Sequence, residues 1–276
     1  MIMTINCNGK LISLERPKIM GILNVTPDSF FDGGKYKDEA SVLNQVDKML
    51  NEGATFIDVG AYSSRPGAKE VGEDTELKRI TPIVSLIINK FPDVILSIDT
   101  FRSNVAKACI ENGAAIVNDI SAGLHDNNML STVAKLNVPY IMMHMRGTPK
   151  NMQQQTDYKD ILKEVLFYFS ERLSAAKALG VKDIIIDPGF GFAKNLEQNF
   201  ELLKQMEVMS IIEHPLLAGI SRKSMIYKTL DVTADQALNG TTALHMACLQ
   251  KGTKILRVHD VKEAVECTKL YEQLNA

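Results

Sequence analysis

A carboxylate stands where a strongly apolar segment stops, in the stretch IIIDPGFGF at residues 184–192. Three isoleucines lead directly into Asp187, and Pro188, Gly189 and Gly191 then exclude regular structure. A buried carboxylate is costly unless other groups donate hydrogen bonds to it. We therefore expect Asp187 either to cap the turn that follows or to face a ligand that donates to it.

Polar residues also end the other short apolar segments of the chain. Each of them alone can be a turn-forming or capping residue. If the segments are parallel strands of one barrel, however, their carboxyl ends meet at one face and the side chains converge there. Such a set would bind a ligand rich in hydrogen-bonding atoms. The residues are Asn24, Asp58, Asp99, Asn118, His144, Asp187, Ser221 with Lys223, and Arg257 with His259.

The apolar segments alternate with longer amphipathic ones, which is the pattern of βα units and a parallel sheet. In residues 38–53, for example, Val42, Val46 and Met49 share one helical face, and Gly53 follows as a helix-ending glycine. Since a (β/α)8 barrel typically has about 250 residues, we predict one TIM-barrel domain over residues 1–276. The predicted strands are 19–26, 55–61, 94–100, 114–120, 139–144, 183–189, 215–221 and 254–260.

The first residues form a separate short unit. Asn8-Gly9 lies between two apolar-alternating arms, which predicts a β-hairpin that covers the amino-terminal end of the barrel.

Composition narrows the class of protein. A hydrophobic content of 45% and a net charge of −2 do not fit a disordered chain or a nucleic-acid-binding protein. The four cysteines lack metal-ligand spacing, which favours reduced thiols in the cytoplasm. We expect neither a signal peptide nor a membrane span.

Several motifs resemble those of dihydropteroate synthase. They are MGILNVTPDSFFDGG at 20–34, DVGAYSSRPGA at 58–68, SIDT at 97–100, VNDI at 117–120, DPGFGF at 187–192, SRKS at 221–224 and RVHD at 257–260. They occur in the order of that family, from about residue 17 to the end. The resemblance implies a TIM barrel, usually a homodimer, that joins 7,8-dihydropterin-6-ylmethyl diphosphate to 4-aminobenzoate and releases diphosphate in folate synthesis.

The resemblance also implies a pterin-binding floor. The carboxylate of Asp187 would accept two parallel N–H donors from the ring, and Asp99 and Asn118 would assist it. Lys223 would donate to a ring oxygen or nitrogen; the alternative is a structural ion pair with a barrel carboxylate. Met142 would form a pocket wall, and Phe190 would either cover the ring or pack in the core.

Diphosphate and metal binding are implied at the other side of the site. Arg257 can stack on the pterin and reach a phosphate, and His259 lies at the same strand end. Mg²⁺ prefers oxygen ligands, and Asn24 stands at the metal-contacting position of the family; alternatively, it starts a turn. Asp32 resembles a residue that acts when its loop closes. Ser64 and Arg65 resemble diphosphate contacts.

The aminobenzoate pocket is implied by a further group of residues. Ala61 and Ser64 replace the glycine and threonine usual in the family, which leaves the shape of this pocket open. The group comprises Phe30, Ser64, Arg65, Pro66, Lys223 and Ser224.

Catalysis would need mainly positioning and electrostatic stabilisation of the leaving diphosphate. The named catalytic residues are Asp32, Asp99, Asp187, Lys223, Arg257 and His259. The alternatives are a pterin-binding methyltransferase domain, a Schiff-base aldolase that uses Lys223, and a catalytically silent pterin-binding paralogue.

Overall fold

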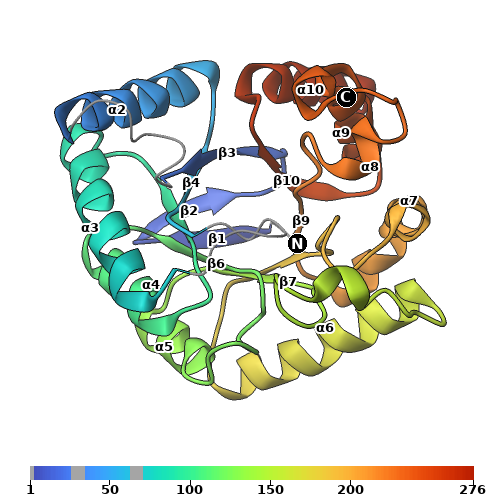
Figure 1. Ribbon diagram of the computed structural model, residues 1–276, viewed down its shortest axis with the longest axis horizontal. Coiled ribbons are helices and arrows are strands. Elements are labelled where there is room, and N and C mark those ends of the chain that lie inside the picture. Colours follow the sequence, from blue (N-terminus) through green and yellow to red (C-terminus); the bar gives the residue numbers. More distant parts are fainter. Residues whose placement is uncertain (1–2, 26–34, 63–70) are drawn as a thin grey trace.

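The computed structural model describes residues 3–25, 35–62 and 71–276, and its centre is a closed barrel of parallel strands (Figure 1). The strands follow one another around the barrel in chain order, and the last pairs with the first. The predicted barrel is thus confirmed, strand by strand. The strands are β3 (Lys18–Asn24), β4 (Phe56–Gly60), β5 (Leu96–Asp99), β6 (Ile116–Asp119), β7 (Tyr140–Met143), β8 (Ile184–Asp187), β9 (Leu216–Ala218) and β10 (Thr253–Val258).

Helices connect the strands and surround the barrel (Figure 1). In the first of them, Val42, Val46 and Met49 are buried as their spacing predicts. Glycines with positive φ, such as Gly53 and Gly113, end helices as expected. The helices are α2 (Lys35–Glu52), α3 (Glu73–Lys90), α4 (Ser103–Glu111), α5 (Met129–Leu136), α6 (Ile161–Ala178), α7 (Leu196–Lys204), α8 (Ser224–Tyr227), α9 (Leu238–Gln250) and α10 (Val261–Leu274), with short 3-10 turns at Met152–Gln154, Met206–Ile212 and Ala234–Gln236.

Successive strand residues alternate between two apolar layers. One layer fills the barrel interior at its amino-terminal end, here called the lower barrel, with residues such as Phe56, Ile141 and Ile185. The other packs between the strands and the helices and includes Ile57 and Ile186. Because side chains alternate along a strand, the layer to which one residue belongs fixes the direction of its neighbours.

The predicted hairpin is also confirmed. β1 (Thr4–Cys7) pairs antiparallel with β2 (Lys10–Ser13), and the two turn residues, Asn8 and Gly9, both have positive φ. Ile5 and Cys7 pack into the lower barrel layer. The backbone N–H of Asn6 donates to Asp183 Oδ2 at 2.8 Å, which ties the hairpin to the residue that precedes β8. The hairpin therefore closes the amino-terminal end of the barrel.

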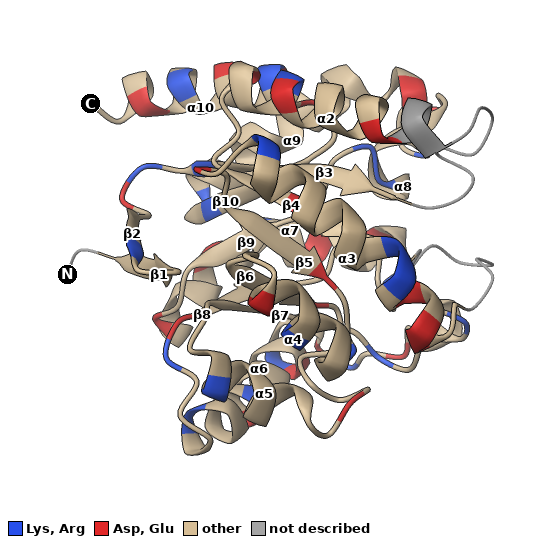
Figure 2. Ribbon diagram, turned by 90° about the vertical axis from the view of Figure 1, so that its left-hand side faces the viewer, with Lys and Arg blue, Asp and Glu red and all other residues tan. Residues whose placement is uncertain are grey.

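The surface carries charges of both signs. Figure 2 shows Lys, Arg, Asp and Glu distributed over the outer helices, in keeping with the net charge of −2. All four cysteines are free and buried. Within the described ranges, no helix has the length and apolar character needed to cross a membrane.

Candidate active site

Arg257 is the centre of a polar network at the carboxyl end of the barrel. Its Nε donates to Asp58 Oδ2 at 2.6 Å, and its Nη2 donates to Asp99 Oδ2 at 2.8 Å. Asn118 Nδ2 donates to the same Asp58 oxygen at 3.0 Å. These contacts join β4, β5, β6 and β10, so four of the predicted strand-end residues do lie together.

Asp99 is poised to change its charge near neutral pH. Burial raises the pKa of its carboxyl group to about 7, against the opposing attraction of Arg257. The negative charge of Asp58 raises this pKa further. A carboxyl group with such a pKa can be present as acid or as carboxylate under ordinary conditions.

The two carboxylate oxygens of Asp187, at the end of the apolar strand β8, have different surroundings. Its Oδ1 accepts a hydrogen bond from the Gly189 N–H at 2.7 Å, so it does cap the turn that follows β8. Its Oδ2 lies on the other side, toward the space beside Gly219. Burial raises the pKa of Asp187, and the nearby Lys223 opposes this shift. One oxygen is thus structural and the other is open to a partner.

Lys223 faces the same space. Its Nζ donates to the carbonyl oxygen of Phe190, and no ion pair of Lys223 is found within the described part of the chain. The predicted alternative of a direct ion pair with a barrel carboxylate is therefore not what the structure shows. Burial lowers the pKa of Lys223 to about 8, and the charge of Asp187 partly offsets this.

The glycine-containing loop after β8 packs very tightly. A Cβ at Gly189 would lie 2.1 Å from the carbonyl oxygen of His144, and its φ is +68°, so only glycine fits. Lys194 holds the loop from behind, because its Nζ contacts Gly189 O at 2.9 Å, Phe192 O at 3.0 Å and His144 Nδ1 at 3.0 Å. His144 is therefore engaged with Lys194 behind the loop.

The prediction that Met142 lines the pocket is wrong. Met142 is fully buried in the layer between strands and helices. Ile141 faces the barrel interior, and by alternation the next inward residue is Met143. Met143 belongs to the small cluster at the barrel mouth, with Met145 and Phe192.

Phe190 packs in the main core and is 0% exposed, so the core alternative is correct and the ring-covering one is wrong. It contributes its backbone carbonyl to Lys223 instead. The ring at the mouth belongs to Phe192, whose centroid lies 4.9 Å from Lys223 Nζ.

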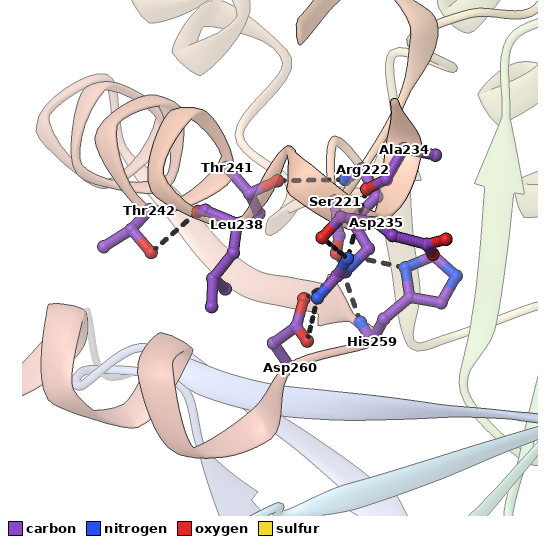
Figure 3. A network of polar contacts seen from close by, with 9 residues as sticks. All are labelled: Ser221, Arg222, Ala234, Asp235, Leu238, Thr241, Thr242, His259 and Asp260. Atoms are coloured by element: carbon purple, nitrogen blue, oxygen red, sulfur yellow. Dashed lines mark hydrogen bonds and ion pairs between the residues drawn. The ribbon is translucent and has the colours of Figure 1, made fainter. Parts of the chain in front are cut away.

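His259 lies at the end of β10 beside Ser221. Its backbone N–H donates to Ser221 Oγ at 3.2 Å, and its Nδ1 is 3.0 Å from the same oxygen. The next residue, Asp260, forms a two-point ion pair with Arg222 at 2.7 and 2.8 Å (Figure 3). This pair joins the SRKS and RVHD motifs, which fixes Lys223 and His259 relative to each other.

The remaining predicted residues divide into two groups. Asn24 is the half-buried last residue of β3, and Ser224 is the half-buried first residue of α8. Asn24 lies at the carboxyl end of its strand, as expected, and Ser224 follows the end of β9 by six residues. Phe30, Asp32, Ser64, Arg65 and Pro66 lie outside the described residues.

Comparison with known proteins identifies the family. Residues 20–259 match the family described as pterin binding enzyme. A dihydropteroate synthase of Haemophilus influenzae is 42% identical over 272 residues, which cover 98% of each chain. A Yersinia pestis dihydropteroate synthase structure, in a sulfonamide drug complex, is 40% identical with a TM-score of 0.92, and 99% of each chain is covered.

A third comparison agrees with these. The Xanthomonas albilineans dihydropteroate synthase with 4-aminobenzoic acid is 35% identical with a TM-score of 0.93, covering 100% of this chain and 99% of that one. Identity of this level over the full length, together with the same barrel, shows that the chain belongs to the dihydropteroate synthases of the pterin-binding enzyme family.

Proposed function

We propose that the barrel mouth performs the dihydropteroate synthase reaction with a pterin held on its floor. The supporting observation is that Asp187 and Lys223 face one space beside Gly219, next to Arg257, whose network includes Asp99 and Asn118. The open oxygen of Asp187 accepts adjacent N–H groups of the pterin, and Lys223 donates to the ring carbonyl or a ring nitrogen. In a dry site such charge-assisted bonds are strong.

Gly219 provides a test of this placement. A methyl group at Gly219 would lie 3.7 Å from Asp187 Oδ2, 3.9 Å from Lys223 Nζ and 4.0 Å from Arg257 Cβ, which are ordinary contacts. Gly219→Ala should therefore fold normally while filling space that the ring needs. We expect about tenfold weaker binding of 6-hydroxymethyl-7,8-dihydropterin by calorimetry. Unchanged affinity, with unchanged urea unfolding, would place the ring elsewhere.

Diphosphate would bind on the side of β10 and β3. Arg257 and His259 supply donors there, Asn24 lies at the neighbouring strand end, and Ser64 and Arg65 contribute by resemblance. His259 is held by Ser221 through both its backbone and its ring nitrogen. Side chains that are already oriented lose less freedom on binding a phosphate.

The donor set also fits Mg²⁺ that arrives with the diphosphate. Among the described residues, no group of three His, Cys, Asp or Glu side chains could form a protein cage for a metal. Mg²⁺ commonly uses few protein ligands together with substrate phosphates and waters. Asn24 would supply one amide oxygen, and the bound ion would neutralise charge on the departing diphosphate.

Aminobenzoate would enter from the side opposite the pterin floor. Lys223 and Ser224, at the start of α8, would lie between the two substrates. Phe30, Ser64, Arg65 and Pro66 complete the pocket by resemblance. A relative has been crystallised with 4-aminobenzoic acid, which supports this class of second substrate.

The reaction would proceed by dissociative substitution. The bond between the pterin methylene carbon and the diphosphate oxygen breaks, and its electron pair leaves with diphosphate. Asp99 and Asp187 stabilise the pterin cation, while Arg65, Arg257 and His259 stabilise the leaving group. The neutral arylamine nitrogen then bonds to the methylene carbon and releases a proton. Positioning supplies most of the acceleration.

The proposed setting is the cytoplasm, with the enzyme acting as a homodimer. The support for the location is the four free, buried cysteines. The dimer rests on resemblance to the family.

A turnover assay with the pterin diphosphate, 4-aminobenzoate and Mg²⁺ tests the function against two alternatives, a catalytically silent pterin-binding paralogue and a pterin-binding methyltransferase domain. His259→Ala should reduce turnover at least about tenfold, because one oriented phosphate donor is lost. Binding of 6-hydroxymethyl-7,8-dihydropterin, which lacks the diphosphate, should change less than about twofold. Equal losses for both ligands would contradict the phosphate role of His259.

A further inference from the structure

We propose that Asp58 is a positioning residue that fixes the orientation of Asn118 and Arg257 and so determines which atoms the floor presents to the pterin. This inference rests on the proposed function of that floor. Asp58 is 0% exposed, and it contacts two of the proposed pterin-binding side chains through a single oxygen, Oδ2. Its other oxygen, Oδ1, is buried and has no hydrogen-bond partner among the described residues, so the contacts of Asp58 that the structure shows all run to Asn118 and Arg257.

The contact with Asn118 decides which end of an amide faces the ligand. An amide has a donor end and an acceptor end of nearly equal size, and either can point forward. Asp58 Oδ2 accepts a 2.6 Å hydrogen bond from Arg257 Nε, so it also faces Asn118 as an acceptor. Asn118 Nδ2 must then turn toward Asp58, at 3.0 Å. Asn118 Oδ1 is left for the ligand.

The consequence is a specific reading of the substrate. With Oδ1 directed away from Asp58, Asn118 selects for an N–H or NH₂ group on the ring. A ring with an acceptor at that place would face the acceptor oxygen of Asn118 without a proton between them and bind poorly. Asp58 thus sets the donor and acceptor pattern of the floor, even though it lies behind the residues that form it.

The contact with Arg257 acts on charge. One guanidinium is shared by two carboxylates, Asp58 and Asp99. The charged groups that influence Asp99 are Arg257 and Lys223, which favour its ionised form, and Asp58, Glu76 and Asp119, which oppose it. Without the charge of Asp58, Asp99 would have one repelling neighbour fewer and the guanidinium to itself.

The neighbouring strand offers a matched control. Ser97 is the residue of β5 that pairs with Asp58 of β4, and it is equally buried. Its hydroxyl has no hydrogen-bond partner among the described residues. Ser97→Ala therefore perturbs the same layer of the barrel without touching the contacts to Asn118 and Arg257.

The experiment compares Asp58→Ala, Ser97→Ala and Asn118→Ala in the full chain. The ligand is 6-hydroxymethyl-7,8-dihydropterin, titrated by calorimetry. We expect Asp58→Ala, which removes the shared acceptor oxygen, to weaken binding at least about tenfold and Ser97→Ala less than about twofold. Because Asp58 acts partly through Asn118, its effect should shrink at least about threefold in the Asn118→Ala background.

A second measurement separates positioning from a merely structural role. The pH dependence of pterin binding should contain a step from the ionisation of Asp99, and Asp58→Ala should move that step to lower pH, because a repelling charge is removed. Loss of packing alone would lower the unfolding midpoint but leave the step in place.

The outcomes are distinct. If Asn118→Ala weakens binding while Asp58→Ala does not, or if the step stays in place, the role of Asp58 is refuted and the floor stands. If neither variant changes pterin binding, the proposed floor itself fails.

Discussion

Asp187→Asn should weaken binding of a dihydropterin by about 100-fold or more, because charge-assisted hydrogen bonds contribute about 1.5–3 kcal/mol each. The variant amide can still accept from the Gly189 N–H through its oxygen, as Asp187 Oδ1 does at 2.7 Å. Its nitrogen then points to the space beside Lys223 and Gly219. The amide N–H of the variant and the N–H of the pterin ring would then face each other as two donors, where the parent chain offers an acceptor oxygen.

The fold should be preserved in this variant. Asp187 is 5% exposed and its pKa is raised by burial, so its charge is costly to the folded protein. An asparagine removes that charge and keeps the shape. We therefore expect an unfolding free energy at pH 8 at least equal to that of the parent chain, measured with urea. Calorimetry that shows full pterin affinity in the variant would remove Asp187 from the binding site.

Much of the fold could be predicted from the sequence. Strands of a parallel barrel are buried on both faces, so they appear as continuous apolar runs with clear ends. The predicted strand 183–189 contains β8 (Ile184–Asp187), and the Asn8-Gly9 turn specified the hairpin. The polar strand ends could be found for the same reason, because a charged residue stands out beside isoleucines.

The direction of single side chains was harder to predict. Met142 and Met143 are adjacent and chemically identical, and a run of apolar residues gives no sign of which one faces inward. The answer depends on the layer of Ile141, which only the barrel packing shows. A one-residue difference sends a strand side chain to the opposite face.

Long-range pairing explains the other differences. In the sequence, Asp58 cannot be distinguished from the other strand-end carboxylates, because its partner Arg257 lies 199 residues away and only the fold brings them together. The same is true of Arg222 and Asp260, whose ion pair joins two motifs. Each lies inside a recognisable motif, but neither motif alone reveals a partner in the other.

The same network predicts a large effect on stability. Arg257→Met keeps a long apolar stem but leaves Asp58 and Asp99 without the guanidinium they share. Breaking a buried pair in this way typically costs about 3–5 kcal/mol, because the carboxylates that remain are unpaired. We expect a loss of that order in unfolding free energy at pH 8, together with loss of pterin binding.

The loss should depend on pH in a defined direction. Burial already raises the pKa of Asp99 from 3.8 to about 7, and removal of Arg257, which lowers it, must raise it further. A carboxyl group with a raised pKa in the folded state favours folding when protonated, and this contribution disappears as pH rises through the folded pKa. The deficit of Arg257→Met should therefore be smaller at pH 5 than at pH 8.

Urea unfolding of the parent chain and of Arg257→Met at the two pH values measures this deficit, and Arg16→Met, whose wild-type side chain is 79% exposed, serves as the control. A deficit of equal size at both pH values would show that packing around the Arg257 stem, and not its charge, maintains the barrel mouth.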